Sequence, residues 1–312
     1  MKYVIGIDGG ATKYLIKACR TDGQELASYS GSPASHYYLS QAEVVARINH
    51  HIDYCLTQFH GRREDCAFLV CGTTGIDTDG DLAIVRALYA SLTGFLCPMT
   101  LLSDAETALY TATGGVGAIV IAGTGSIAFG RNARGDTARC GGWPPCIMGD
   151  EGSGAWIGYR AVNHMSLLLD ERVPPSPLSK SLAGVLKIKS KEDLMAICLN
   201  IQQRTWQDPG LSLLVNEAAQ GGDDQAIAIL REAAIHTFSL ADAIINKLHL
   251  FDDPKFQVAA WGSAITKCPH HYTRFKSLIQ EKYPHAHVLI SKTDAATGAC
   301  RLAISQLLKQ TM

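Results

Sequence analysis

A strand, a glycine-rich turn and a returning strand occur in the same order at two places in this 312-residue chain. The first occurrence spans residues 4–22, with Gly9 and Gly10 in its turn, and the second spans residues 118–136, with Gly123 and Gly125. An apolar run that enters such a turn and leaves it as a second strand predicts a hairpin. We interpret the recurrence as an internal duplication, which predicts two α/β lobes that each open with a hairpin.

Helices and strands alternate after the first hairpin. A capping box predicts a helix that begins after Ser40, helical spacing continues at residues 82–92 and 105–111, and short buried strands are predicted at 67–71 and 99–103. This alternation favours a largely parallel sheet.

The second half of the chain is more helical. Helices are predicted at 154–169, 191–203, 223–248 and 295–309, strands at 256–261 and 287–290, and a proline-rich loop at 173–179. We place an N-terminal lobe at residues 1–113 and a C-terminal lobe at 114–312. We expect helix 295–309 to pack back onto the N-terminal lobe.

Composition argues against several classes of protein. The chain has 28 Lys and Arg against 29 Asp and Glu, without a block of like charge, which argues against a nucleic-acid partner. The Gly- and Thr-rich stretch 114–130 does not resemble a membrane span, which needs ~20 apolar residues. The ten cysteines include no C-x-x-C pair, so neither a zinc ribbon nor a disulfide framework is indicated. Because Asp8 interrupts the apolar opening, we expect no signal peptide and a cytoplasmic protein with reduced cysteines.

The two glycine turns are candidate phosphate sites. Backbone N–H groups and hydroxyls in such turns can bind one polyphosphate, with Thr12 and Lys13 in the first turn and Thr124 and Ser126 in the second. The alternative is that the glycines only permit tight turns.

Two carboxylates stand at predicted strand ends. Asp8 suits a water-mediated Mg²⁺ contact, although it could instead accept hydrogen bonds from the turn amides. Asp104 follows strand 99–103 at its carboxyl end, where open α/β sheets place their ligands, and is a candidate general base. Asp104 could equally be the N-cap of the next helix.

Residues 140–154 are rich in glycine and proline and contain Trp143, Asp150 and Glu151. This composition favours a binding loop before a helix N-terminus, although the two acidic residues could simply favour a helix start. The pairs at 50–51 and 270–271 are histidines without a partner at metal-ligand spacing, and Cys140 and Cys146 lack a second pair.

These motifs together resemble the N-acetylglucosamine kinase family, within the BadF/BadG-type ATPases of the actin–hexokinase superfamily. The resemblance covers most of the chain. It rests on residues 8–13 (DGGATK), 103–105 (SDA), 122–126 (AGTGS), 140–143 (CGGW), 149–153 (GDEGS), 261–264 (WGSA) and 294–299 (DAATGA).

The resemblance implies two actin-like, ribonuclease H-like lobes with ATP, Mg²⁺ and an amino sugar in the cleft between them, and a homodimer. It implies that Asp104 removes the proton of the sugar 6-hydroxyl, and Asp8 remains the candidate for Mg²⁺ because of its place at the strand end. The implied nucleotide site consists of Gly10, Thr12, Lys13, Gly123, Thr124, Gly125, Ser126, Ala218, Gly262 and Ser263. The implied sugar site consists of Ser35, His36, Asp104, Gly142, Trp143, Pro144 and Asp150.

Two departures concern the sugar side. Ser35 stands where the family typically has an Asn, and the loop after Trp143 is one residue longer than the usual pattern. We predict an ATP-dependent kinase acting on N-acetylglucosamine, N-acetylmuramic acid or glucosamine. The competing hypotheses on the same fold are an iron–sulfur activator ATPase of 2-hydroxyacyl-CoA dehydratases and a sugar-sensing repressor. The repressor would need a DNA-binding helix-turn-helix.

Overall fold

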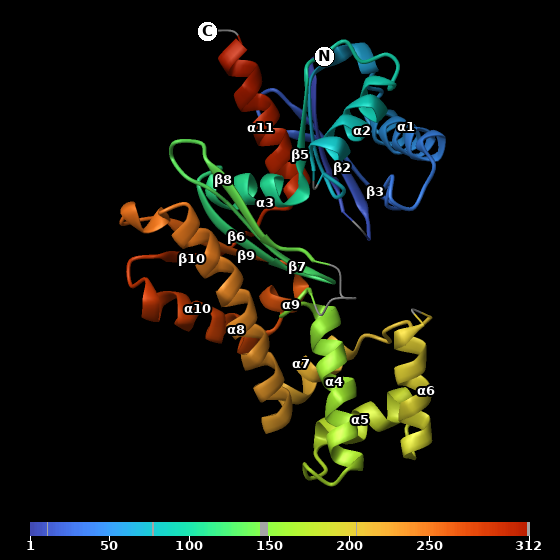
Figure 1. Ribbon diagram of the computed structural model, residues 1–312. Helices are drawn as coiled ribbons and strands as arrows, with labels where there is room; N and C mark the ends of the chain where they lie inside the picture. Colours follow the sequence, from blue (N-terminus) through green and yellow to red (C-terminus); the bar gives the residue numbers. More distant parts are fainter. Residues whose placement is uncertain (11, 77, 144–148, 204, 311–312) are drawn as a thin grey trace. The chain divides into compact units, whose positions relative to one another are not determined.

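We describe the protein from a computed structural model, which covers residues 1–312 except 11, 77, 144–148, 204, 311 and 312 (Figure 1). Contacts divide the chain into two compact units. Unit 1 comprises Met1–Val116 and Ser291–Met312, and unit 2 comprises Gly117–Ile290.

Unit 1 is built on a five-stranded sheet in the order β3-β2-β1-β4-β5. The strands are β1 (Tyr3–Gly9), β2 (Tyr14–Arg20), β3 (Glu25–Gly31), β4 (Cys66–Thr73) and β5 (Met99–Ser103). The first three strands pair antiparallel, and β1, β4 and β5 pair parallel. The helices are α1 (Gln41–Thr57), α2 (Asp79–Ala90), α3 (Asp104–Thr113) and α11 (Ala295–Gln310), with a short 3₁₀ turn at Arg63–Asp65.

The two faces of this sheet carry separate cores. Successive side chains of a strand point to opposite faces. Thus Ile5 and Ile7 of β1 join a cluster with apolar residues of α1 and α2. Val4 joins another, with Ala299 and Cys300 of α11. The central strand is therefore covered on both sides, which explains why no charged side chain occurs in it from Tyr3 to Ile7, before Asp8.

Unit 2 repeats the plan. Its sheet has the order β10-β9-β6-β7-β8, which matches unit 1 when read from the opposite edge. The strands are β6 (Gly117–Ala122), β7 (Ser126–Arg131), β8 (Thr137–Gly141), β9 (Gln257–Trp261) and β10 (His287–Ile290). The β6–β7 and β7–β8 pairs are antiparallel, and the β6–β9 and β9–β10 pairs are parallel. The shared strand order and directions confirm the predicted duplication.

The helices of unit 2 are more numerous. They are α4 (Gly154–Leu169), α5 (Pro177–Leu186), α6 (Lys191–Gln202), α7 (Leu211–Gln220), α8 (Asp224–Lys247), α9 (Ser263–Thr266) and α10 (Pro269–Lys282), with a 3₁₀ turn at Leu250–Asp252. The long helix α8 contacts β6, β7 and β8, whereas α5 and α6 lie beside α4, away from the sheet (Figure 1). No helix among the described residues is both long and apolar enough to cross a membrane.

The loop predicted at 173–179 is wrong in its last part. Helix α5 begins at Pro177, because Ser176 accepts the N–H of Ser179 and proline is well tolerated in the first helical turn. Strand β8 and helices α7, α9 and α10 were also not among the predicted elements.

Glycine lets α11 approach the first sheet closely. A methyl group on Gly6 of β1 would lie 2.5 Å from the backbone nitrogen of Cys300 and would also overlap the Ala296 carbonyl. A larger residue at position 6 therefore requires α11 to move.

We predict that Gly6→Ala lowers the free energy of unfolding by roughly 1–3 kcal/mol, the usual cost of overpacking. Urea unfolding measures the change. Gly184→Ala is the control, because a methyl group there meets no atom within 4 Å on α5 and alanine favours helix. Equal destabilisation by the two substitutions would contradict the close packing of α11 on β1.

Candidate active site

Three parallel strands of unit 1 end at the same level. Their carboxyl ends, which we call the acidic edge of the sheet, carry two carboxylates. Asp8 lies opposite Gly72 of β4, and Thr73 lies opposite Ser103, the last residue of β5. Asp104 follows directly as the first residue of α3. Gly72 permits this arrangement, because a side chain there would collide with Thr107 of α3.

Burial and the charges of neighbouring side chains shift the pKa of Asp8. Burial raises the pKa of Asp8 to about 6, the Asp104 carboxylate adds to the rise, Lys13 opposes it and Asp294 contributes weakly. Ionising Asp8 in the folded protein therefore costs free energy near neutral pH.

Asp104 is not the N-cap of α3, so that alternative is wrong. Ser103 is the cap, and its hydroxyl oxygen accepts the N–H of Glu106 at 3.1 Å. The Asp104 carboxylate accepts the N–H of Ala105 at 2.8 Å from within the first turn.

The donor set suits Mg²⁺. Asp8 and Asp104 offer only carboxylate oxygens, and Mg²⁺ in nucleotide enzymes typically uses one or two carboxylates with water and phosphates for the remainder. Among the described residues, no group of three or more His, Cys, Asp or Glu forms a preformed metal cage. A cation bound nearby would stabilise the ionised form of Asp8 and so lower its raised pKa.

The first glycine turn exposes its polar side chains. Gly10, Thr12 and Lys13 connect β1 to β2, and Thr12 and Lys13 are exposed. The Thr12 hydroxyl makes no hydrogen bond to another described residue, so it is available to a ligand.

The second glycine turn supports the start of α4. The Gly123 carbonyl accepts the N–H of Gly154 at 2.7 Å, and the Thr124 carbonyl accepts that of Ala155 at 3.2 Å. Thr124 is exposed, and within the described part of unit 2 its hydroxyl is unbonded. Ser126, the other hydroxyl-bearing residue of this turn, is buried, and its hydroxyl donates to the Glu151 carbonyl at 2.8 Å.

Asp150 lies against this same turn. Its carboxylate accepts the N–H of Ser126 at 2.8 Å and contacts Gly125, where a side chain would not fit. Asp150 adopts a left-handed backbone with φ of 60°. Burial raises the pKa of Asp150 while the Ser126 hydrogen bond opposes the rise.

Two further residues predicted for the site in unit 2, Gly262 and Gly142, contact the second glycine turn. Gly262, with φ of 88°, packs on Ala122 and Gly123, where any side chain would overlap the backbone. Gly142 donates its N–H to the Ser126 carbonyl at 2.8 Å, and the Trp143 side chain is 65% exposed.

The other positions predicted in unit 2 make no hydrogen bond to the second glycine turn among the described residues. Ser263 is exposed at the start of α9, and Ala218 is half-buried in α7. Pro144 lies outside the described residues.

Two of the residues predicted to bind the sugar, Ser35 and His36, belong to the segment that follows β3 in unit 1. Ser35 is buried and its hydroxyl oxygen accepts the N–H of Tyr37 at 3.3 Å. The His36 ring contacts Gly75, two residues after β4, and its Nε2 lies 3.7 Å from Asp81 Oδ1. Thr74 then donates its N–H to the Gly9 carbonyl at 2.8 Å, which links this segment to the Asp8 edge.

Sequence reasoning did not assign Asp294 and Thr73 to the site. Asp294 accepts the N–H of Thr297 at the start of α11 and forms an ion pair with Lys17 at 2.9 Å. Its negative charge also contributes to the raised pKa of Asp8. The Thr73 hydroxyl donates to the Gly9 carbonyl at 3.2 Å. An acidic residue before a small-residue helix was the available signal for Asp294, but only the fold brings it near Asp8.

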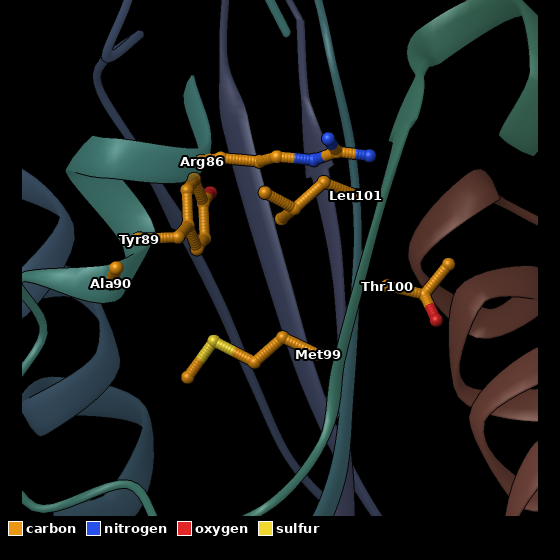
Figure 2. Close-up of a pocket in the computed structure, with 6 residues that line it drawn as sticks. All are labelled: Arg86, Tyr89, Ala90, Met99, Thr100 and Leu101. Atoms are coloured by element: carbon orange, nitrogen blue, oxygen red, sulfur yellow. The ribbon is translucent and has the colours of Figure 1, made fainter. Parts of the chain in front are cut away.

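A groove of about 420 Å³ lies elsewhere in unit 1. It is lined by Arg86, Tyr89, Ala90, Met99, Thr100 and Leu101. Figure 2 shows Met99 and Leu101 pointing from β5 toward α2, with Thr100 pointing the other way. No predicted site residue lines this groove, so we do not assign it to the active site.

We predict that the contribution of Asp8 to stability falls as pH rises from about 4 to about 6, because folded Asp8 retains a proton that its unfolded counterpart, with a pKa of 3.8, has lost. Asp8→Asn removes this penalty and should raise the free energy of unfolding by roughly 1–3 kcal/mol above pH 6, with little gain near pH 4. Urea unfolding without divalent cations measures both. Asp22→Asn, on an exposed turn, is the control, and a gain that is independent of pH would contradict the assignment.

Comparison with known proteins supports the predicted resemblance. The model of the BadF/BadG/BcrA/BcrD ATPase family matches residues 5–303. A protein of Clostridium acetobutylicum named N-acetylmuramic acid/N-acetylglucosamine kinase is 33% identical over 310 residues, covering 98% of this chain and 99% of that protein. The N-acetyl-D-glucosamine kinase of Dictyostelium discoideum is 33% identical over 312 residues, covering 96% and 97%.

The solved structure of a candidate N-acetylglucosamine kinase from Chromobacterium violaceum has a TM-score of 0.74 at 26% identity, covering 97% of this chain and 99% of that one. This similarity, with the repeated sheet order, confirms the predicted actin-like architecture. Since the family model and two relatives of nearly full length agree, the chain belongs to the BadF/BadG/BcrA/BcrD ATPase family.

Proposed function

We propose that this chain is an ATP- and Mg²⁺-dependent kinase that phosphorylates the 6-hydroxyl of N-acetylglucosamine or a related amino sugar. The related candidates are N-acetylmuramic acid and glucosamine. The observation that carries the proposal is the 33% identity, over nearly the whole of both chains, to two proteins named as kinases of such sugars. The acidic sheet edge and the two glycine turns support it, since phosphoryl transfer depends mainly on positioning and charge stabilisation.

Asp104 is the proposed general base. It accepts the proton of the sugar 6-hydroxyl while that oxygen bonds to the γ-phosphorus of ATP. The bond from the γ-phosphorus to the bridging oxygen of the β-phosphate breaks, and ADP leaves. Its place at the carboxyl end of β5 supports this role, and the cap function that competed with it belongs to Ser103.

Exposed groups of the glycine turns are proposed to bind the nucleotide. Thr12 and Thr124 offer hydroxyls, Lys13 offers a positive charge, and Gly10, Gly123 and Gly125 permit close approach of phosphate oxygens. Asp8 is proposed to orient Mg²⁺ through water. When bound, Mg²⁺ neutralises charge on the phosphates and offsets the cost of ionising Asp8.

The sugar and the adenosine are assigned to the remaining predicted residues. Ser35, His36, Gly142, Trp143, Pro144 and Asp150 are proposed for the sugar, and Ala218, Gly262 and Ser263 for adenosine. The exposed Trp143 ring offers an apolar face, and the Asp150 carboxylate can accept a sugar hydroxyl, a combination that suits pyranoses.

We also propose a cytoplasmic location and a homodimer. The described cysteines form no disulfide, which suits a reducing compartment. The homodimer rests on the family resemblance, and light scattering after size exclusion tests it.

A coupled ADP-release assay tests the function. We expect N-acetylglucosamine to stimulate ADP release above the ATPase background and to exceed glucosamine in kcat/KM, because no acidic residue is proposed to pair with a free amine. Ser35→Asn should narrow the range of sugars accepted, because an amide donates and accepts at once. A tenfold preference for glucosamine would sink the acetamido assignment. Sugar-independent ADP release from a brown protein would favour the iron–sulfur activator instead.

Two substitutions should separate base from phosphate binding. Asp104→Asn should lower kcat by roughly 10²–10⁴-fold with little change in ATP affinity, the usual worth of a positioned base. Thr124→Val conserves volume but removes a hydroxyl, so it should weaken ATP binding with a smaller effect on the chemical step. Steady-state kinetics and calorimetry distinguish them. Near-normal kcat in Asp104→Asn would contradict its role as base.

A further inference from the structure

We propose that Arg47 and His51 of α1 are positioning residues for the sugar. They hold the backbone of residues 32 and 33, two residues before Ser35, so that Ser35 meets the substrate in a fixed place. The hydrogen bonds from Arg47 and His51 to the carbonyls of residues 33 and 32 are called the clamp below. This inference rests on the proposed function, because it assigns the clamp a role in sugar recognition. Neither residue is proposed to touch the sugar.

The His51 side chain holds the first residue after β3. His51 is 3% exposed, and its Nε2 lies 2.9 Å from the Ser32 carbonyl oxygen. Because a carbonyl only accepts, the proton must be on Nε2, and the buried Nδ1 has no partner within the described residues. Burial lowers the pKa of His51, which keeps the ring neutral at physiological pH.

The ring is fixed by its surroundings. Its centroid lies 5.5 Å from that of Tyr14 and 5.3 Å from that of Tyr29, on β2 and β3. It also packs on Gly31, where any side chain would overlap it. The hydrogen bond to Ser32 therefore comes from a donor that has little freedom to move.

Arg47 holds the next residue from one helical turn earlier. Its Nη1 donates to the Pro33 carbonyl at 2.6 Å. Residues four apart lie on the same face of a helix, so α1 presents both donors to consecutive carbonyls. Val44, Ile48 and Ile52 anchor α1 in the core of unit 1, which makes the clamp part of a rigid element.

The held segment leads directly to the proposed sugar residues. The Ser35 carbonyl accepts the N–H groups of Tyr38 and Leu39, each at 3.2 Å, in a compact turn. His36 then packs on Gly75, close to the strand end that is linked to Gly9. A small displacement at Ser32 and Pro33 would therefore move Ser35 relative to the Asp8 edge, and such displacements reduce substrate recognition.

The test compares Arg47→Met and His51→Leu with the wild-type enzyme. We expect the sugar KM to rise about three- to tenfold, the worth of a hydrogen bond, with the KM for ATP changed by less than about twofold. His51→Gln should recover most of the loss, because its amide can donate near the Nε2 position. Arg86→Met, exposed on α2, is a control that should leave both KM values unchanged.

A double-mutant cycle separates positioning from general stability. In the Ser35→Ala background, Arg47→Met should raise the sugar KM by less than about twofold, because the group it positions is gone. Full additivity, or equal changes in the KM for sugar and ATP, would overturn the inference.

Hydrogen exchange gives a readout that does not require activity. The amides of Tyr38 and Leu39 should exchange faster in Arg47→Met and His51→Leu than in the wild type. Unchanged exchange would overturn the clamp even if kinetics changed. A wild-type protein without sugar-stimulated ADP release would instead overturn the proposed function, whereas an active wild type with unaffected variants would overturn this inference alone.

Discussion

The repulsion between two carboxylates at one sheet edge is the constraint on which the candidate site depends. Asp8 and Asp104 come together because β1, β4 and β5 run parallel and end at the same level. Gly72, between them, has no side chain, so α3 can lie close over the edge. Burial and, after it, the nearby Asp104 carboxylate raise the pKa of Asp8, so ionising Asp8 in this place costs free energy. An edge of this kind favours a cation, and through the cation it favours phosphate groups.

Most of the architecture could be predicted because local patterns and the tertiary fold agree. The two hairpins, the strand before Asp104 and the long helix α8 each have strong apolar periodicity or a clear turn. Strand β8 was missed because its five residues, including Arg139, have no apolar run and lie at a sheet edge. Helix α10 was missed because one of its three buried residues, which recur at helical spacing, is a histidine, and a histidine in the sequence does not indicate a core position; the fold nevertheless buries His271 with Phe275 and Ile279.

The site was less predictable than the fold, because proximity decides roles that spacing leaves open. Asp104 could have been a cap on spacing alone, and only the hydrogen bond to Ser103 assigns the cap. Asp294 lies 286 residues after Asp8 in the chain, so no local pattern relates them. Its contribution depends on α11 packing on the sheet of unit 1, which the glycine at position 6 makes possible.

The two hydroxyl groups of the second glycine turn differ in whether they already have a hydrogen-bond partner within the protein. The motif Gly123-Thr124-Gly125-Ser126 contains two hydroxyls, which the sequence treats alike. In the fold, the Ser126 hydroxyl and N–H both bind the segment at Asp150 and Glu151, so this serine fixes the loop that precedes α4. Thr124 retains an exposed hydroxyl at the tip of the turn. A buried polar group that already has its partner gains little from a ligand, whereas an exposed one exchanges only water. Within this turn, the group that can take a phosphate oxygen at least cost is therefore Thr124, and Ser126 acts by holding the turn and Asp150 together.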